Sequence, residues 1–275
     1  MGKLQKEQEA LAEQSSAGHD LAPPEYAAAA SDDSNAPDAP PPGYTPGPSP
    51  YEKVPVGWNL YYKAWSMRTF HIGPHADQPV FALELHSGLL SSRPFLILFD
   101  GADAKTAPRI ATAHRDGLMK GHAAITVPGA AAPEKLTVHS RRMNFSFNVG
   151  SGKETRREDF EWRYSHGKEV KVLDRWGRGW KLVRLGADGG GGGGEGQDKV
   201  GRSARPHGES SDGHPVVAVF ADNSKWSKTK VARFHFVGAG ATDEFGEPWA
   251  MFVTMSALRI WELMMNARAS AAGAA

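Results

Sequence analysis

The sequence predicts a mainly β protein: a closed antiparallel β-barrel of about 12 strands around a central, hydrophobic C-terminal α-helix. The first observation behind this prediction is a series of about eleven strand-like runs between residues 58 and 237, spaced about ten residues apart. Gly, Pro and Asp turn signals separate these runs, as is typical of an antiparallel sandwich or barrel. The second observation is a single helical segment, residues 248–267, which follows the strands and is apolar almost all round.

Individual strands are recognised where apolar and polar residues alternate with a period of two. Phe145 and Phe147 alternate with Asn and Ser in one run. Phe160 and Trp162 alternate with charged residues in the next. The strands expected on this basis are residues 65–72, 79–86, 95–99, 109–114, 123–127, 136–149 (two strands or one bulged strand), 159–164, 170–173, 180–185, 216–220 and 231–237.

The apolar segment 248–267 is either a buried core helix or a membrane span. As a span it is short, at roughly 17 residues between Trp249 and Met265. It would also bring Arg259 and Glu262 into the bilayer, where an arginine near the centre costs about 2.5 kcal/mol or more. Eight strands close a barrel that side chains alone can fill, whereas about eleven leave room for a central helix. We therefore predict that the helix fills the barrel, with a membrane anchor as the alternative.

Composition divides the chain into a tail, a barrel domain and a short end. Residues 1–56 are rich in Ala, Pro, Ser and acidic residues and poor in aliphatic ones, which predicts disorder. We expect the barrel domain at 57–267, with a flexible Gly-rich insertion at 186–214, and a second disordered tail at 268–275. The net charge is −6 over the first 57 residues and +7 over the remainder. Such a body attracts anionic surfaces weakly and falls short of the charge of a nucleic-acid-binding protein.

Several function classes find no support in the sequence. The chain has no cysteine, so disulfides and thiolate metal sites are excluded. It shows no nucleophile signature, and no set of ligands with metal-binding spacing. We therefore expect a protein that is not an enzyme, with no catalytic residue, no metal and no cofactor. The charged N-terminus does not resemble a signal peptide, which favours a cytoplasmic protein that is not integral to a membrane.

The acidic tail contains two copies of the motif Pro-Pro-x-Tyr, the ligand of WW domains. The motif residues are Pro23, Pro24, Tyr26, Pro41, Pro42 and Tyr44. The prolines favour an extended polyproline II helix that fits an aromatic groove, and the tyrosine fills an adjacent pocket. The residues between the two motifs span roughly 20 Å as a flexible coil, so one partner with two WW domains can engage both. The alternative is a linker with incidental tyrosines.

A second candidate site is a basic turn between two predicted strands near the end of the barrel. Its residues are Lys225, Trp226, Lys228 and Lys230. Lysines around an exposed tryptophan suit the headgroup region of an anionic membrane. The alternative is a solvated hairpin in which Trp226 folds over the barrel end.

Three segments and the order of the elements carry a resemblance to a known family. The segments are Phe95-Leu96-Ile97-Leu98-Phe99-Asp100, Phe234-His235-Phe236, and Glu247-Pro248-Trp249 at the start of the helix. With these features, residues 58–267 resemble the tubby C-terminal-like superfamily, which includes LURP-one-related proteins and phospholipid scramblases. The Pro-Pro-x-Tyr tail also resembles the tails of scramblases and of adaptors for HECT-type ubiquitin ligases, and the combination is most similar to uncharacterised fungal members.

The resemblance has two departures that limit what it implies. Scramblases have a cysteine cluster for lipidation, which this chain lacks. They also have a calcium loop before the helix, where this chain has only Asp243, Glu244 and Glu247. We therefore expect a non-enzymatic adaptor that recruits a WW-domain protein, such as a HECT-type ubiquitin ligase. The alternative is a peripheral protein that binds phosphoinositides or other anionic phospholipids, and lipid scrambling is the third.

Overall fold

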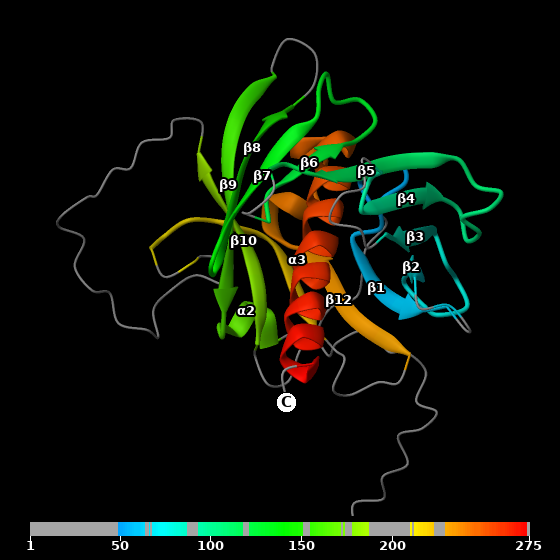
Figure 1. The fold of residues 1–275 in the computed structure, drawn as a ribbon. Helices are drawn as coiled ribbons and strands as arrows, with labels where there is room; N and C mark the ends of the chain where they lie inside the picture. Colours follow the sequence, from blue (N-terminus) through cyan, green and yellow to red (C-terminus); the bar gives the residue numbers. More distant parts are fainter. Residues whose placement is uncertain are drawn as a thin grey trace, which may run out of the picture. The chain divides into compact units, whose positions relative to one another are not determined.

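The structure is a computed structural model, and the residues it describes belong to the unit Pro40–Ala275. The described residues are 49–63, 66, 68–86, 93–117, 121–150, 155–171, 173, 178–186, 210, 212–222 and 229–273. They form a closed barrel of twelve antiparallel strands with a long C-terminal helix (Figure 1). The predicted fold class is therefore confirmed.

Each strand pairs with its neighbours in chain order, and pairing of the first strand with the last closes the barrel. The strands are β1 (Gly57–Tyr62), β2 (Thr69–Gly73), β3 (Phe81–Leu85), β4 (Leu96–Asp100), β5 (Arg109–Arg115), β6 (Ala123–Thr126), β7 (Glu134–His139), β8 (Arg142–Val149), β9 (Arg156–Ser165), β10 (Gly179–Gly186), β11 (Val216–Asp222) and β12 (Lys230–Phe236). The helical elements are α2 (Lys168–Lys171), η2 (Gly238–Ala241), η3 (Asp243–Phe245) and α3 (Glu247–Gly273).

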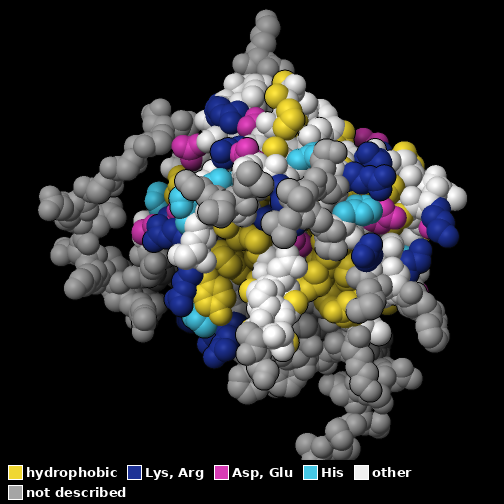
Figure 2. All heavy atoms as spheres, viewed as in Figure 1, with side chains coloured by type: hydrophobic (Ala, Val, Ile, Leu, Met, Phe, Trp, Pro, Cys, Tyr) yellow, Lys and Arg dark blue, Asp and Glu magenta, His cyan; other side chains and the backbone are white. Residues whose placement is uncertain are grey.

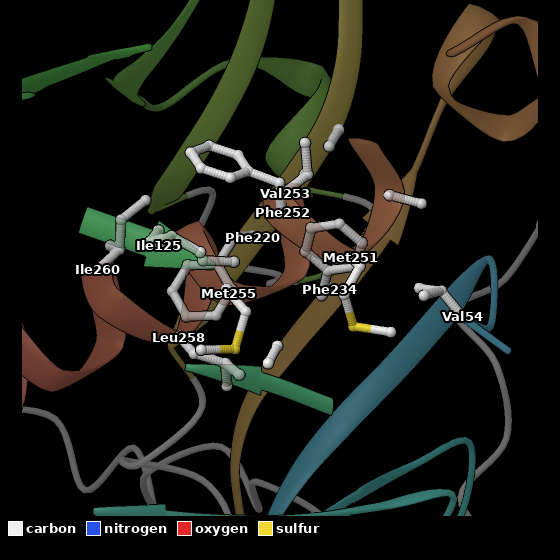
Figure 3. Packing of buried hydrophobic residues seen from close by; sticks show 14 of the residues in the cluster. Val54, Ile125, Phe220, Phe234, Met251, Phe252, Val253, Met255, Leu258 and Ile260 are labelled. Carbon is white, nitrogen blue, oxygen red and sulfur yellow. The ribbon is translucent and has the colours of Figure 1, made fainter. Parts of the chain in front are cut away.

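Helix α3 fills the barrel. Every residue from Trp249 to Glu262 is buried, as expected for a helix surrounded by strands on all sides. The aromatic contacts of α3 reach strands on opposite parts of the wall: Phe252 lies 4.7 Å from Phe145 of β8, measured between ring centroids, and Trp261 lies 4.7 Å from Phe70 of β2. Figure 3 shows side chains of the helix packed among residues of the surrounding strands. In the described part of the chain, no helix has both the length and the hydropathy that a membrane crossing requires.

Several polar residues of α3 bond to one another or to the wall. The Trp162 indole N–H donates to the Ser256 hydroxyl at 2.8 Å, and that hydroxyl donates to the Val253 carbonyl at 2.7 Å. One turn further on, the buried Arg259 and Glu262 form an ion pair. Such partners offset the cost of placing polar groups in an apolar interior.

The structure corrects four details of the predicted organisation and settles one alternative that the prediction left open. Strand β1 was not expected, and the predicted strand 170–173 lies in and just after the short helix α2. Residues 136–149, for which one bulged strand was an alternative, belong to the two strands β7 and β8. The predicted tail 1–56 ends too late, because the strap (residues 49–56) is packed on the barrel. The predicted tail 268–275 begins too early, because α3 continues to Gly273.

Acidification is expected to destabilise the barrel through His235, whose ring covers Gly57 on the neighbouring strand. Burial, aided by the charge of Arg233, lowers the pKa of His235 from 6.5 to about 4. The unfolded chain therefore takes up this proton at higher pH than the folded protein does. The contribution of neutral His235 to the free energy of unfolding is fully present above about pH 6.5. It is lost as the pH falls from about 6.5 to about 4, which lowers the free energy of unfolding by up to about 3 kcal/mol.

Urea unfolding at about pH 7 and about pH 4 measures this loss. His235→Asn removes the titrating group but keeps a neutral, polar side chain, although a smaller one. The variant should lose less stability on acidification than the unmodified protein does. Equal losses in the two proteins would contradict the assignment.

Candidate functional site

The strap lies between the N-terminal arm and β1 in the sequence, and it is bound to the first residue of helix α3. Val54 is fully buried in the main core, and Figure 3 shows it on the side of the helix where Met251 lies. Tyr51 is 5% exposed, and its hydroxyl donates to the Gly240 carbonyl at 2.6 Å. The strap is therefore part of the folded domain, although its sequence is as rich in polar residues and proline as the arm before it.

The carboxylate of Glu247, the first residue of α3, holds the strap. It accepts the backbone N–H groups of Glu52 at 2.8 Å and of Lys53 and Val54 at 3.2 Å each. A carboxylate that accepts backbone N–H groups forms strong, charge-assisted hydrogen bonds. The side chain that opens the core helix thus also fixes the path of the incoming chain.

Three carboxylates influence the Tyr51 hydroxyl. Burial raises the pKa of the Tyr51 hydroxyl, and the carboxylates of Glu247, Asp243 and Glu244 raise it further. The hydroxyl therefore stays protonated and available as a donor to Gly240.

The predicted WW-binding residues lie outside the described residues. They are Pro23, Pro24, Tyr26, Pro41, Pro42 and Tyr44. The sequence places Tyr44 five residues before Ser49, the first described residue. A fully extended chain of that length spans at most about 18 Å, so the second motif is tethered close to the start of the strap.

A basic corner (Arg141, Arg142, Lys168 and Lys171) forms where the β7–β8 turn meets the connection from β9 to β10. The backbone N–H of Tyr164 near the end of β9 donates to the Arg141 carbonyl at 3.4 Å, which joins the two segments. All four cationic residues are exposed. Figure 2 shows Lys, Arg and His side chains gathered around α2, at the lower left of the view.

The carboxylates near the basic corner, Glu161 and Glu169, are already paired. Glu161 pairs with Arg142 and Arg163. Burial opposes ionisation of Glu169, but hydrogen bonds, above all from Lys181 at 2.9 Å, hold the pKa of this carboxyl below its usual range. Among the described residues, no carboxylate forms an ion pair with the other three cations of the corner.

The basic turn predicted as a lipid-binding site is described only at its end. Lys225, Trp226 and Lys228 lie outside the described residues. Lys230, the first residue of β12, is 6% exposed, and its ammonium group lies 5.8 Å from the centre of the Tyr61 ring. The expectation that Lys230 faces a membrane headgroup is therefore wrong, because this side chain packs against the barrel wall.

Two of the three acidic residues near the start of α3, Glu244 and Glu247, are occupied by protein donors. Glu247 holds the strap, and Glu244 pairs with Arg156 at 3.1 Å and Arg184 at 2.9 Å. The described residues contain no group of three or more potential metal ligands. A depression of about 350 Å³ on the outer face of β7 to β9 is lined by groups that also pair with one another, such as Arg157 with Glu134 at 2.8 Å.

Sequence reasoning missed the strap and the basic corner for different reasons. The corner joins residues more than twenty positions apart, and only the register of β8 with β9 brings them together. Matching the two alternating runs as a hairpin would have placed Arg142 opposite Arg163. The strap has no periodic pattern, so only its isolated apolar residues, Tyr51 and Val54, could have indicated it.

Comparisons with protein-family models, with curated proteins and with solved structures found no match to this chain.

Proposed function

We propose that the protein is a non-enzymatic adaptor whose N-terminal arm recruits a WW-domain protein, such as a HECT-type ubiquitin ligase. The observation that carries this proposal is the anchoring of the strap at Glu247 and Gly240. An arm fixed by hydrogen bonds at its base tethers both Pro-Pro-x-Tyr motifs to a rigid body. Two motifs on one tether raise the effective concentration of the second binding event, by about 100-fold or more in affinity.

The interior of the barrel supports the same proposal. It is filled by α3, so the described wall is the surface that the barrel offers to a partner. A filled, rigid barrel suits a protein that presents binding segments.

Substituting both motif tyrosines is expected to abolish binding to a tandem WW-domain protein. Each of Tyr26→Ala and Tyr44→Ala removes an aromatic anchor, and such anchors typically contribute about 2 kcal/mol or more, or about 30-fold in affinity. Isothermal titration of the full chain with tandem WW domains measures the effect. Tyr62→Ala is the control, since Tyr62 is 46% exposed and lies on the barrel. An unchanged affinity in the double variant would overturn the proposal.

A second function, binding to anionic phospholipid surfaces, is favoured by the basic corner. Exposed cations can attract lipid phosphate groups when the neighbouring carboxylates are already paired. Each Lys or Arg near an anionic membrane contributes about 1 kcal/mol to the binding free energy. The exposed Tyr164 beside them adds an amphipathic ring that suits the interface between headgroups and acyl chains.

Removing two cations of the corner is expected to weaken vesicle binding by about 30-fold. Lys168→Gln with Lys171→Gln tests this by sedimentation of the full chain with phosphatidylserine and phosphoinositide vesicles at low salt. Lys105→Gln with Arg109→Gln is the matched control, because both are exposed cations in and after the β4–β5 loop. Equal binding by the two variants would contradict a lipid-binding role for the corner.

A further inference from the structure

Ser49 stands out among the hydroxyl residues of the chain. The sequence has only two places where Ser or Thr precedes Pro, Thr45-Pro46 and Ser49-Pro50, and both lie between the second Pro-Pro-x-Tyr motif and the barrel. Ser49 and Pro50 are both exposed, so the dipeptide is accessible in the folded domain.

The Ser49 hydroxyl holds the turn with which the strap begins. It donates to the Val54 carbonyl at 2.6 Å and accepts the Tyr51 backbone N–H at 3.2 Å. The first bond closes a loop from Ser49 to Val54. The second holds Tyr51, whose hydroxyl donates to Gly240 of η2. The donated bond requires the hydroxyl proton.

We propose that Ser49 is a phosphorylation site for a proline-directed protein kinase and that a phosphate at this position releases the strap from the barrel. In this reaction the Ser49 oxygen attacks the γ-phosphorus of a nucleoside triphosphate, and a new O–P bond forms. The bond between that phosphorus and the bridging oxygen breaks, so the nucleoside diphosphate leaves. The hydroxyl proton passes to a base of the kinase.

Release follows from the chemistry of the modified side chain. Phosphoserine has no proton on its bridging oxygen, so the donated bond to the Val54 carbonyl is lost and two acceptors face each other. The phosphate adds a charge of about −1.5 to −2 at neutral pH. This charge adds to that of Glu52 in the strap and of Glu247, which accepts the Val54 N–H, while Lys53 of the strap is already paired with Asp100.

The released strap would change the start of the barrel helix. Glu247 would lose the three N–H groups it accepts, and the apolar side chains of Tyr51 and Val54 would leave the core. The arm would become longer by the length of the strap. This inference does not depend on WW-domain binding, and its test measures the strap directly.

Kinase labelling tests the site. The full chain carrying Thr45→Ala is incubated with a proline-directed kinase and radiolabelled ATP, and we expect about one phosphate per chain. The same chain with Ser49→Ala as well should take up none. Absence of label in the Thr45→Ala protein would overturn the assignment of the site.

Hydrogen exchange tests the release without a kinase. In full-length protein with phosphoserine encoded at position 49, the amides of residues 51–54 should exchange about tenfold faster or more, as expected for the loss of a hydrogen bond. The amides of β8 and β9 should not change. Glu247→Ala, which removes the anchor without any phosphate, shows how fast a released strap exchanges. Unchanged exchange in the phosphoserine protein would overturn the release.

Discussion

Replacing Arg259 by alanine is expected to lower the free energy of unfolding by about 3 to 5 kcal/mol. Arg259 is 3% exposed inside the barrel, where it pairs with Glu262, donates to the Gly121 carbonyl at 2.7 Å and lies 4.4 Å from the centre of the Phe95 ring. Its removal leaves the Glu262 carboxylate buried, with a hydrogen bond from Asn266 at 2.6 Å as its remaining side-chain partner. An uncompensated buried charge is costly because water cannot reach it. Equilibrium unfolding in urea, followed by circular dichroism, measures the loss.

A double variant distinguishes the loss of one ion of the pair from the loss of both ions. Arg259→Leu with Glu262→Leu removes both ions and is expected to be near neutral or stabilising, because neither charge then needs to leave water. The coupling energy of a double-mutant cycle through the two single variants should be at least about 1 kcal/mol. Purely additive effects would show that the two side chains do not act as a pair.

Replacing Trp249 by alanine is expected to cost about 3 to 5 kcal/mol, a large part of the stability of a typical domain. Trp249 is fully buried, and its ring lies 4.4 Å from Phe245, 5.5 Å from Phe160 and 5.6 Å from Phe236, measured between ring centroids. Alanine would leave a cavity where helix, wall and η3 meet, and the surrounding strands cannot collapse into it because they are closed in a ring. Thermal and urea unfolding check the size of the effect.

The matched control for Trp249 is an aromatic residue on the surface. Tyr62→Ala removes a ring that is 46% exposed and should cost no more than about 1 kcal/mol. If the two variants lost similar stability, α3 would not be the filler of the barrel.

The architecture could be predicted because the clearest patterns in the sequence, the apolar helix and the alternating strands, result from tertiary packing. Only a helix enclosed on all sides can bury both Phe252 and Trp261, which point in opposite directions, and this enclosure is visible as apolar residues all round. Likewise, the alternation around Phe145 and Phe160 exists because one face of each strand meets the helix, and the register pairs these two residues. The sequence did not decide whether residues 136–149 form one strand or two, because the residues on both sides of the β7–β8 turn have strand-like patterns.

Each of the failures has its own physical cause. Residues 170–173 contain two apolar side chains, Val170 and Leu173, and so short a run fits a strand or a helical turn equally well. Strand β1 begins at Gly57, directly after a proline-rich stretch, so it was merged with the start of the domain. The anchors of the strap are contacts between residues almost 200 positions apart, such as Glu52 with Glu247, and no periodicity reports such contacts.

The candidate sites also differ in whether their residues are contiguous in the sequence or are brought together by folding. The Pro-Pro-x-Tyr motifs are read from contiguous residues, and binding to WW domains stays a prediction. The basic corner depends on strand pairing, so a sequence scan found another lysine group instead, of which Lys230 proved to be buried. The tubby-like resemblance also stays a prediction, since the confirmed element is the barrel with its helix.

The position of α3 at the end of the strand series has a consequence for synthesis on the ribosome. Strand β1 pairs with β12, and the barrel closes around a helix that is translated after all twelve strands. At about 5 to 20 residues per second, roughly 10 to 40 s separate the appearance of Tyr62 from that of Gly273. Throughout that interval the nascent strands expose aromatic side chains that have nothing to cover them, so protection by chaperones is expected to govern the yield of native protein.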